Sequence, residues 1–180
     1  MSDVPQGGKA IAPAGQRASG PIIRRKSLTA YNEGSMLTVI DAGEHGSFAT
    51  DEPVEHGGTG EGPSPLQTVL GALCGCESVT FHRTAGERGF QYRGITFEAE
   101  YTIDIRGRMG DPDVRPHFQT VRVQAVVDTD ESEKALASVV EETERRCPVF
   151  NLMRDAGVHV EMQWVGGGAS ADPARGLTMR

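Results

Sequence analysis

Residues 57–79 read GGTGEGPSPLQTVLGALCGCESV, and this segment predicts the element around which the chain folds. A glycine-rich turn leads to Ser64, Pro65 and Gln67, which together signal a helix start: an N-cap, a proline at the first helical position and a completed capping box. The twelve residues that begin with Pro65 carry no charge. A helix that is apolar or small on all sides is buried, so we expect a long central helix that runs to about residue 85.

The two sides of this expected helix differ in side-chain size. The larger side chains fall on one stripe, which we expect to face the core: Leu66, Val69, Leu70, Leu73, Cys76 and Thr80. Gly71, Ala72 and Gly75 fall on the opposite side, where small residues let another backbone come close. This small face therefore predicts a dimer that covers the central helices of both chains.

Alternation of apolar and polar residues predicts strands on both sides of the helix. A weaker pair of strands is expected over residues 28–32 and 36–41, and a short strand around Phe48. Three long strands are expected over residues 95–106, 121–127 and 158–164. The polar segment 106–119 fits the loop of a long hairpin. Because the alternation leaves one face of each strand polar, it favours an antiparallel sheet over a buried parallel one.

A second helix is predicted from Asp130, with Glu133 three residues later as another capping box. Its inner face is expected to comprise Leu136, Val139, Val140, Thr143 and Cys147. Pro148 ends this helix, and a short third helix is expected over residues 149–156. Cys147 then lies at the N-terminal end of the third helix, where unpaired amides and the helix dipole favour a thiolate.

Composition limits the functions open to the chain. It has 180 residues, the size of a single domain, and its 25 Asp and Glu against 18 Lys and Arg give a net charge of −7. An acidic chain is a poor partner for nucleic acid or an anionic membrane surface. No apolar run reaches the roughly 20 residues needed to span a bilayer.

The ends of the chain and its cysteines also carry information. Residues 1–20 and 166–180 are rich in Gly, Pro and Ala and are expected to be flexible tails around a domain of residues 21–165. Residues 1–20 lack the apolar core of a secretory signal, and three cysteines are too few for a disulfide scaffold. We therefore expect a cytoplasmic protein with reduced thiols.

Metal and phosphate sites find little support in the sequence. The five histidines show no His-x-His or His-x-x-x-His spacing. Cys74 and Cys76 point about 200° apart on a helix, so they cannot share a metal or form an unstrained disulfide. The glycine-rich turn lacks the Lys-Ser/Thr of a phosphate-binding loop. The remaining candidate is a redox pair of Cys76 and Cys147, and the competing interpretation is that both thiols only fill space in the core.

Two segments resemble the OsmC/Ohr family. Residues 57–79 resemble its central helix: a Gly-rich turn, a Ser/Asn-Pro start and a cysteine eleven residues after that proline, which is Cys76 here. Residues 144–164, ERRCPVFNLMRDAGVHVEMQW, resemble the element that carries the family's second cysteine, here Cys147. The order of the expected helices and strands also agrees, over about residues 28–164.

The resemblance implies an α+β fold, in which a curved antiparallel sheet packs on a long buried central helix and a second helix. It implies an intertwined homodimer with active sites at its interface. It also implies a peroxidase of the oxidative stress response that reduces organic hydroperoxides and hydrogen peroxide. Cys76 would attack the peroxide and become a sulfenic acid, Cys147 would resolve it as a disulfide, and an external dithiol would restore the pair. Neither a metal nor an organic cofactor would take part.

The chain departs from the family's peroxidase branch at two positions. That branch has a Glu ten residues before its first cysteine, where this chain has Leu66, and an Arg after its first strand, where residues 31–35 contain none. Arg24, Arg25 and Arg83 are the substitutes to consider, because a thiol without a nearby cation reacts slowly. Two alternatives therefore stay open: a protein that binds an apolar small molecule at the dimer interface, and a thiol-based redox sensor with no substrate of its own.

Glu77 is the only carboxylate close to Cys76 in the expected helix. Its neighbouring position is expected to point it partly away, and a negative charge there would raise the pKa of the thiol. By this local argument Cys147 is the better activated thiol, which conflicts with the roles that the resemblance implies.

Overall fold

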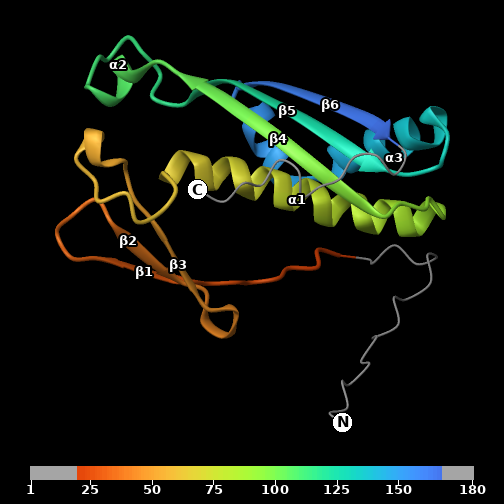
Figure 1. Ribbon diagram of the computed structural model, residues 1–180, viewed down its shortest axis with the longest axis horizontal. Helices are drawn as coiled ribbons and strands as arrows, with labels where there is room; N and C mark the ends of the chain where they lie inside the picture. The colour runs from red at the N-terminus through yellow and green to blue at the C-terminus, as the bar shows by residue number, and fades with distance from the viewer. Residues whose placement is uncertain (1–19, 168–180) are drawn as a thin grey trace.

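The computed structural model describes residues 20–167, which form two three-stranded sheets and four α-helices (Figure 1). The strands are β1 (Thr29–Asn32), β2 (Thr38–Asp41), β3 (Ser47–Thr50), β4 (Gly94–Ile103), β5 (Phe118–Asp128) and β6 (His159–Gly167). The helices are α1 (Pro65–Arg88), α2 (Ile105–Arg108), α3 (Glu133–Arg146) and α4 (Pro148–Asp155), with 3-10 turns at Gly43–His45 and Val54–His56. The predicted tails, residues 1–20 and 166–180, lie outside the described residues except for Gly20 and the last two residues of β6.

The central helix α1 begins as predicted. Ser64 Oγ accepts a hydrogen bond from the backbone N–H of Gln67 at 3.2 Å, and Gln67 Oε1 accepts one from the backbone N–H of Ser64 at 2.9 Å. Pro65 is the first helical residue, so all three start signals act together. The helix ends at Gly89, whose φ of 69° is the left-handed conformation that suits glycine.

The buried face of α1 lies to one side of the predicted stripe. The buried residues are Leu70, Leu73, Glu77, Phe81, Thr84 and Ala85. Val69 is 41% exposed, so its assignment to the core is wrong, and Cys76 is half-buried. The predicted stripe ran through Cys76 and Thr80, whereas the buried residues, spaced three and four apart, include the acidic Glu77.

The turn before α1 is built around a buried carboxylate. Asp51 accepts hydrogen bonds from the backbone N–H and hydroxyl of Thr59, at 2.8 and 2.7 Å, and from the backbone N–H of Glu61 at 3.3 Å. The Thr59 hydroxyl and these amides lower the pKa of Asp51 to about 2. A Cβ on Gly58 would lie 1.8 Å from the carbonyl oxygen of Glu52, so this close approach requires glycine.

The first sheet follows the prediction. β1 and β2 form the expected hairpin, with Ala30 opposite Ile40, and β3 adds Phe48 opposite Ile40 on the other side. Figure 1 shows this sheet set apart from the second one, near the N-terminal half of α1. Within the described residues it makes no contacts with the helices comparable to those that α1 makes with α3, α4 and β4.

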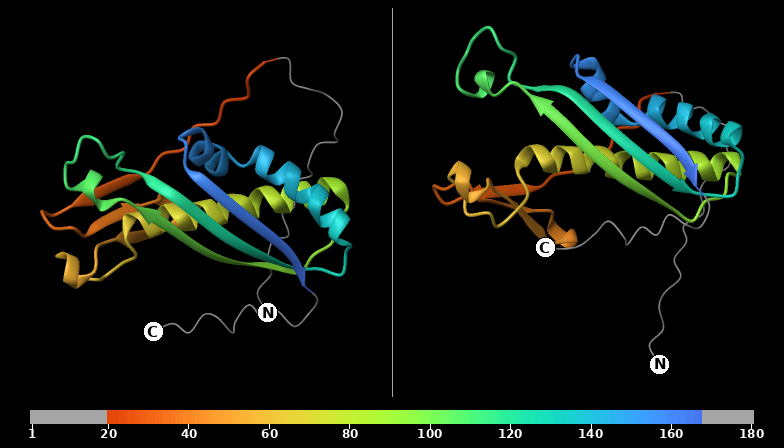
Figure 2. Two further views of the ribbon diagram at one scale, coloured as in Figure 1. Left: turned by 90° about the horizontal axis from the view of Figure 1, so that it is seen from above. Right: turned by 45° about the horizontal axis from the view of Figure 1, so that its top comes forward.

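The second sheet is mixed, which corrects the prediction of an antiparallel sheet. β4 pairs with β5 antiparallel, with Ile95 opposite Val127, whereas β5 pairs with β6 in parallel, with Val121 beside Val160. The cause is the connection, because α3 and α4 carry the chain back along the sheet before β6 begins (Figure 2). Alternation could not show this, since β5 keeps one buried and one polar face whatever the direction of its neighbour.

The hairpin of β4 and β5 is confirmed, but its loop contains a helical turn. β4 ends at Ile103, earlier than predicted, because Asp104 accepts a hydrogen bond from the backbone N–H of Arg106 at 3.1 Å and caps α2. None of the helices within residues 20–167 is long and apolar enough to cross a membrane.

The cap predicted for the second helix is also corrected. The N-cap of α3 is Ser132, whose hydroxyl accepts a hydrogen bond from the backbone N–H of Ala135 at 3.3 Å. Asp130 instead pairs with Arg93, at 2.6 Å. The third helix is confirmed as α4, one residue earlier than predicted at each end.

The core lies between the buried face of β5 and the helices. One cluster includes Leu73 of α1, Val121 of β5 and Cys147 at the junction of α3 and α4. A second cluster includes Phe81 of α1, on which Trp164 of β6 stacks with ring centroids 5.2 Å apart and planes 12° apart. The candidate thiols therefore belong to the first cluster.

Candidate functional site

The structure brings Cys76 and Cys147 together. Cys76 lies on α1 and Cys147 joins α3 to α4, and both side chains pack in the same apolar cluster, where Cys76 raises the pKa of the Cys147 thiol. All three cysteines of the chain are free. The predicted pair is thus a spatial pair of reduced thiols in one apolar cluster.

The two thiols differ in access to solvent. Cys76 is half-buried, whereas Cys147 is completely buried. Cys74, two residues before Cys76, is half-buried and packs against the same apolar cluster. Burial raises the pKa of the Cys74 thiol, with a small further contribution from the charge of Glu77. Of Cys76 and Cys147, only Cys76 is open to a small molecule from outside.

Cys147 is held in place at the junction of two helices. It is both the C-cap of α3 and the N-cap of α4. Its sulfur accepts a hydrogen bond from the backbone N–H of Phe150 at 3.5 Å. Its carbonyl oxygen accepts a hydrogen bond from Asn151 Nδ2 at 2.8 Å, and the same amide donates to the carbonyl of Glu144 at 2.9 Å. These contacts fix the backbone that carries the thiol.

The expected activation of Cys147 is wrong. The helix start supplies the predicted amide donor, which lowers the pKa of the thiol, but burial raises that pKa far more. Neighbouring Glu77 and Cys76 raise it further. The Cys147 thiol is therefore protonated at neutral pH, because desolvation outweighs the single hydrogen bond.

The expected orientation of Glu77 is wrong. Instead of pointing away, its side chain is completely buried and lies close to the Cys147 thiol. Within the described residues, neither carboxylate oxygen of Glu77 has a hydrogen-bond partner. The signal was present in the spacing, since Leu73, Glu77 and Phe81 recur every four residues on one helix face.

Burial dominates the electrostatics of Glu77. It raises the pKa of this carboxyl to about 7, the Cys147 thiol partly offsets the shift, and the charge of Glu144 adds to it. Glu144 is itself half-buried, accepts a hydrogen bond from Trp164 Nε1 at 3.2 Å, and has a pKa raised by burial. Glu77 is therefore distributed between its neutral and charged forms near neutral pH.

The cations of neighbouring segments are committed elsewhere or exposed. Arg145 and Arg146 both pair with Glu142, and Arg146 also reaches Glu87 at 2.6 Å. Arg83, considered as a substitute for the arginine of the peroxidase branch, is exposed. The other substitutes, Arg24 and Arg25, are exposed as well.

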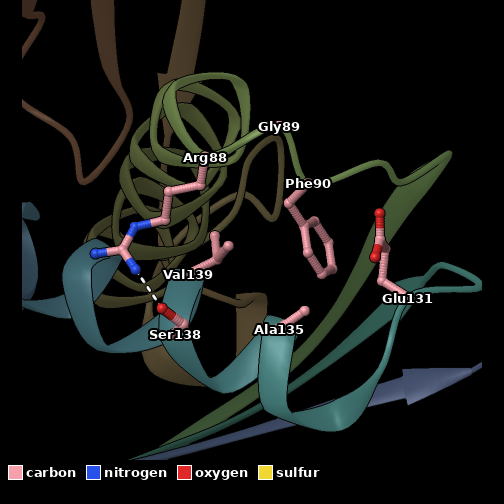
Figure 3. Close-up of a pocket in the computed structure, with 7 residues that line it drawn as sticks. All are labelled: Arg88, Gly89, Phe90, Glu131, Ala135, Ser138 and Val139. Atoms are coloured by element: carbon pink, nitrogen blue, oxygen red, sulfur yellow. Dashed lines mark hydrogen bonds between the residues drawn. The ribbon is translucent and has the colours of Figure 1, made fainter.

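Two cavities lie at the ends of α1. The cavity at its C-terminal end has a volume of about 360 Å³ and is lined by Arg88, Phe90 and Glu131, with Arg88 bonded to Ser138 (Figure 3). No cysteine lines it, so we assign the redox chemistry elsewhere. The cavity at the N-terminal end has a volume of about 290 Å³. It is lined by Glu52, Pro65, Leu66, Ile103, Asp104, Arg108, Pro116 and His117.

Two of the charged residues that line the second cavity form an ion pair. Arg108 Nη2 lies 3.4 Å from Glu52 Oε1, while Leu66 supplies an apolar wall at the position where the peroxidase branch has Glu. Within residues 20–167, no group of three or more His, Cys, Asp or Glu side chains has the arrangement of a metal site.

Comparison of the sequence with models of protein families finds one matching family. The model of the family described as OsmC-like protein matches residues 58–163, which is more than half of the chain. A search of curated proteins finds no match. The match includes both Cys76 and Cys147.

Solved structures share the fold at low sequence identity. An OsmC-like protein from Mycoplasma pneumoniae aligns with a TM-score of 0.69 and 16% identity, over 81% of this chain and 99% of that one. An organic hydroperoxide resistance protein OsmC from Legionella pneumophila aligns with a TM-score of 0.60 and 16% identity, over 80% and 98% of the two chains. The organic hydroperoxide resistance protein OhrB of Bacillus subtilis gives 0.55 and 20% identity, over 79% and 98%.

Proposed function

Because the chain belongs to the OsmC-like protein family, we propose that it is a thiol-dependent hydroperoxide reductase that works through Cys76 and Cys147. The observation that carries this proposal is the spatial pairing of a half-buried thiol with a completely buried one. The names of the Legionella and Bacillus structures, which refer to organic hydroperoxide resistance, support the choice of substrate.

The reaction needs no group beyond the two thiols, the peroxide and an external reductant. The Cys76 thiolate attacks one peroxide oxygen, the O–O bond breaks, and the alcohol leaves with a proton while Cys76 becomes a sulfenic acid. Cys147 then attacks the sulfenic sulfur, and a disulfide forms as water leaves. An external dithiol reduces this disulfide and returns both residues to thiols.

The surroundings of Cys76 favour an organic hydroperoxide. Cys76 packs against an apolar cluster together with Leu66, Phe97 and Tyr101, so an apolar substituent next to the peroxide loses little by leaving water. Hydrogen peroxide gains nothing from these contacts. We therefore expect both peroxides to react and the organic one to react faster.

A homodimer accounts for the exposed face of α1. Val69 and Val79 are 41% and 52% exposed, and a Cβ on Gly71 or Gly75 would meet nothing within 4 Å. The first sheet also lacks a packing partner comparable to that of the second within the described chain. Two copies that place these surfaces against each other would bury them and enclose the thiols.

Stopped-flow oxidation of the reduced protein tests the function. Cumene hydroperoxide should oxidise the wild type and Cys74→Ser at similar rates, and Cys76→Ser should lose the reaction. A Cys76→Ser variant with full turnover would overturn the proposal. Wild-type rates no faster than those of a free thiol would also count against it.

The cavity beside Leu66 supports a second candidate function. The apolar side chains of Leu66 and Ile103, beside the ion pair of Arg108 and Glu52, fit a small apolar ligand that carries a polar end. In that case the thiols would be structural or regulatory. Titration with a fluorescent fatty acid, together with peroxide rates at the level of a free thiol, would favour binding over catalysis.

A further inference from the structure

A completely buried thiol that must act as a nucleophile needs a proton acceptor inside the protein. Cys147 has no contact with solvent, and burial holds its thiol in the protonated form. Water therefore cannot take the proton directly as the sulfur attacks. The acceptor has to be a group already in contact with the thiol.

Most neighbours of Cys147 cannot serve. The backbone N–H of Phe150 donates to the sulfur and has no capacity to accept a proton. The hydroxyl of Thr143 is committed to the carbonyl of Val139 at 2.8 Å. Cys76 is the sulfur under attack, and Glu144 is engaged by Trp164. The carboxylate of Glu77 is the neighbour that stays free.

The state of Glu77 fits this task. A buried carboxylate without a hydrogen-bond partner destabilises a fold, so its presence at the thiol pair calls for a functional explanation. It follows Cys76 directly on α1, and its side chain lies close to the Cys147 thiol. A carboxyl whose pKa is about 7 can both take and return a proton near neutral pH.

We propose that Glu77 is the internal base that accepts the proton of the Cys147 thiol when this thiol attacks oxidised Cys76. This inference rests on the pairing in the proposed function. The S–H electron pair of Cys147 becomes the new S–S bond, and the thiol proton passes to Glu77. The S–O bond of the Cys76 sulfenic acid breaks, and the leaving hydroxide takes the proton from Glu77 and departs as water.

The titratable groups that act on Glu77 come from two elements. Glu144 of α3 and Cys147, at the end of α3, both affect the pKa of Glu77. The charge of Glu77 in turn affects the pKa of Cys74 on α1. Trp164, which reaches this region from β6, is neutral. The rate of the resolving step should therefore rise with pH through about 7 and then level off, as Glu77 becomes charged.

A thiol-exchange assay tests this step without peroxide. In the full-length Cys74→Ser protein, Ellman's reagent converts the accessible Cys76 to a mixed disulfide with thionitrobenzoate. Attack by Cys147 then releases a second thionitrobenzoate, whose absorbance gives the rate, and Cys147→Ser should stop after the first release. In this background, Glu77→Gln should slow the second release by at least about tenfold at pH 7.5.

Two further variants keep the assay decisive. Glu77→Asp keeps the carboxylate and should recover part of the rate of the second release. If Glu77→Gln does not fold, Glu77→Asp still tests whether the position of the carboxylate sets this rate. Glu144→Gln removes a charge nearby but keeps the base, so it should preserve the plateau rate and move the midpoint to lower pH. In Glu77→Gln, the rate of the second release should no longer level off near pH 7. A residue that acts only through packing would not change the pH profile in this way.

The opposite result is equally clear. If Glu77 only repels charge on Cys147, Glu77→Gln should speed the second release, and an unchanged rate and pH profile would likewise overturn the proposal. Because no peroxide is used, a protein that fails to reduce hydroperoxides but needs Glu77 for exchange would reject the proposed function and keep this inference.

Discussion

The sulfur of Cys147 accepts a hydrogen bond from the backbone N–H of Phe150 at 3.5 Å, yet the thiol stays protonated because it is completely buried. A helix start alone would favour a thiolate. Burial therefore favours Cys147 as the resolving thiol and the half-buried Cys76 as the first to meet a peroxide. Access to solvent, not the local helix geometry, supports the order of the two steps.

Removal of the resolving thiol should trap the first intermediate. Cys147→Ser is expected to react once with cumene hydroperoxide and to stop as a sulfenic acid on Cys76, because no other sulfur is placed to displace the hydroxyl. Dimedone labelling followed by mass spectrometry measures the trapped species. A disulfide between Cys74 and Cys76 in this variant would contradict the predicted geometry.

Glu77 should make the stability of the protein depend on pH. Its pKa in the folded state, about 7, lies above the ordinary value of 4.5, so the folded state binds more protons between these values. The contribution of Glu77 to the free energy of unfolding should therefore fall by about 3 kcal/mol as pH rises from 4.5 to 8. Urea unfolding at several pH values measures this fall, which Glu77→Gln should lack. An equally steep fall in the variant would show that other groups cause it.

Two glycines should respond to alanine in opposite directions. Gly58→Ala places a Cβ against the carbonyl oxygen of Glu52 and should destabilise the turn before α1 by more than about 2 kcal/mol. Gly86→Ala meets open space on α1, away from Gly71 and Gly75, and should leave the fold intact, with a gain of up to about 1 kcal/mol in helix propensity. Thermal unfolding compares the two, and equal effects would count against the described turn.

The dimer proposal predicts a position-dependent effect of added bulk. Gly75→Leu should fill the space kept for a partner backbone and weaken association, although the protomer itself has room for the side chain. Lys134→Leu, at an exposed position on α3, is the matched control and should not change the mass. Light scattering after size-exclusion chromatography gives the mass in solution, and a wild-type protein that is already monomeric would reject the dimer.

Much of the fold could be predicted because its signals are local. The capping box of Ser64 and Gln67 fixes the start of α1 within the chain itself, and strict alternation marks β4 and β5. The two cysteines could be paired because each falls in a segment with a recognisable motif. These features depend on neighbours in sequence, so no tertiary information was needed.

The errors arose where tertiary packing decides. The direction of β6 depends on the path of α3 and α4, which alternation does not record. Asp130 and Ser132 are both good N-caps, and the pairing of Asp130 with Arg93 leaves Ser132 as the cap. Glu77 was expected to point partly away because it is next to Cys76 in sequence, whereas its side chain is completely buried and close to Cys147.

The most direct test of the account is to map the disulfide that forms when the reduced protein receives one equivalent of cumene hydroperoxide. Peptide mass spectrometry without reduction identifies the linked cysteines. The account predicts a stoichiometric bridge between Cys76 and Cys147, with Cys74 left as a free thiol. Oxidation that stops at sulfenic or sulfinic acid, or a bridge that involves Cys74, would contradict it.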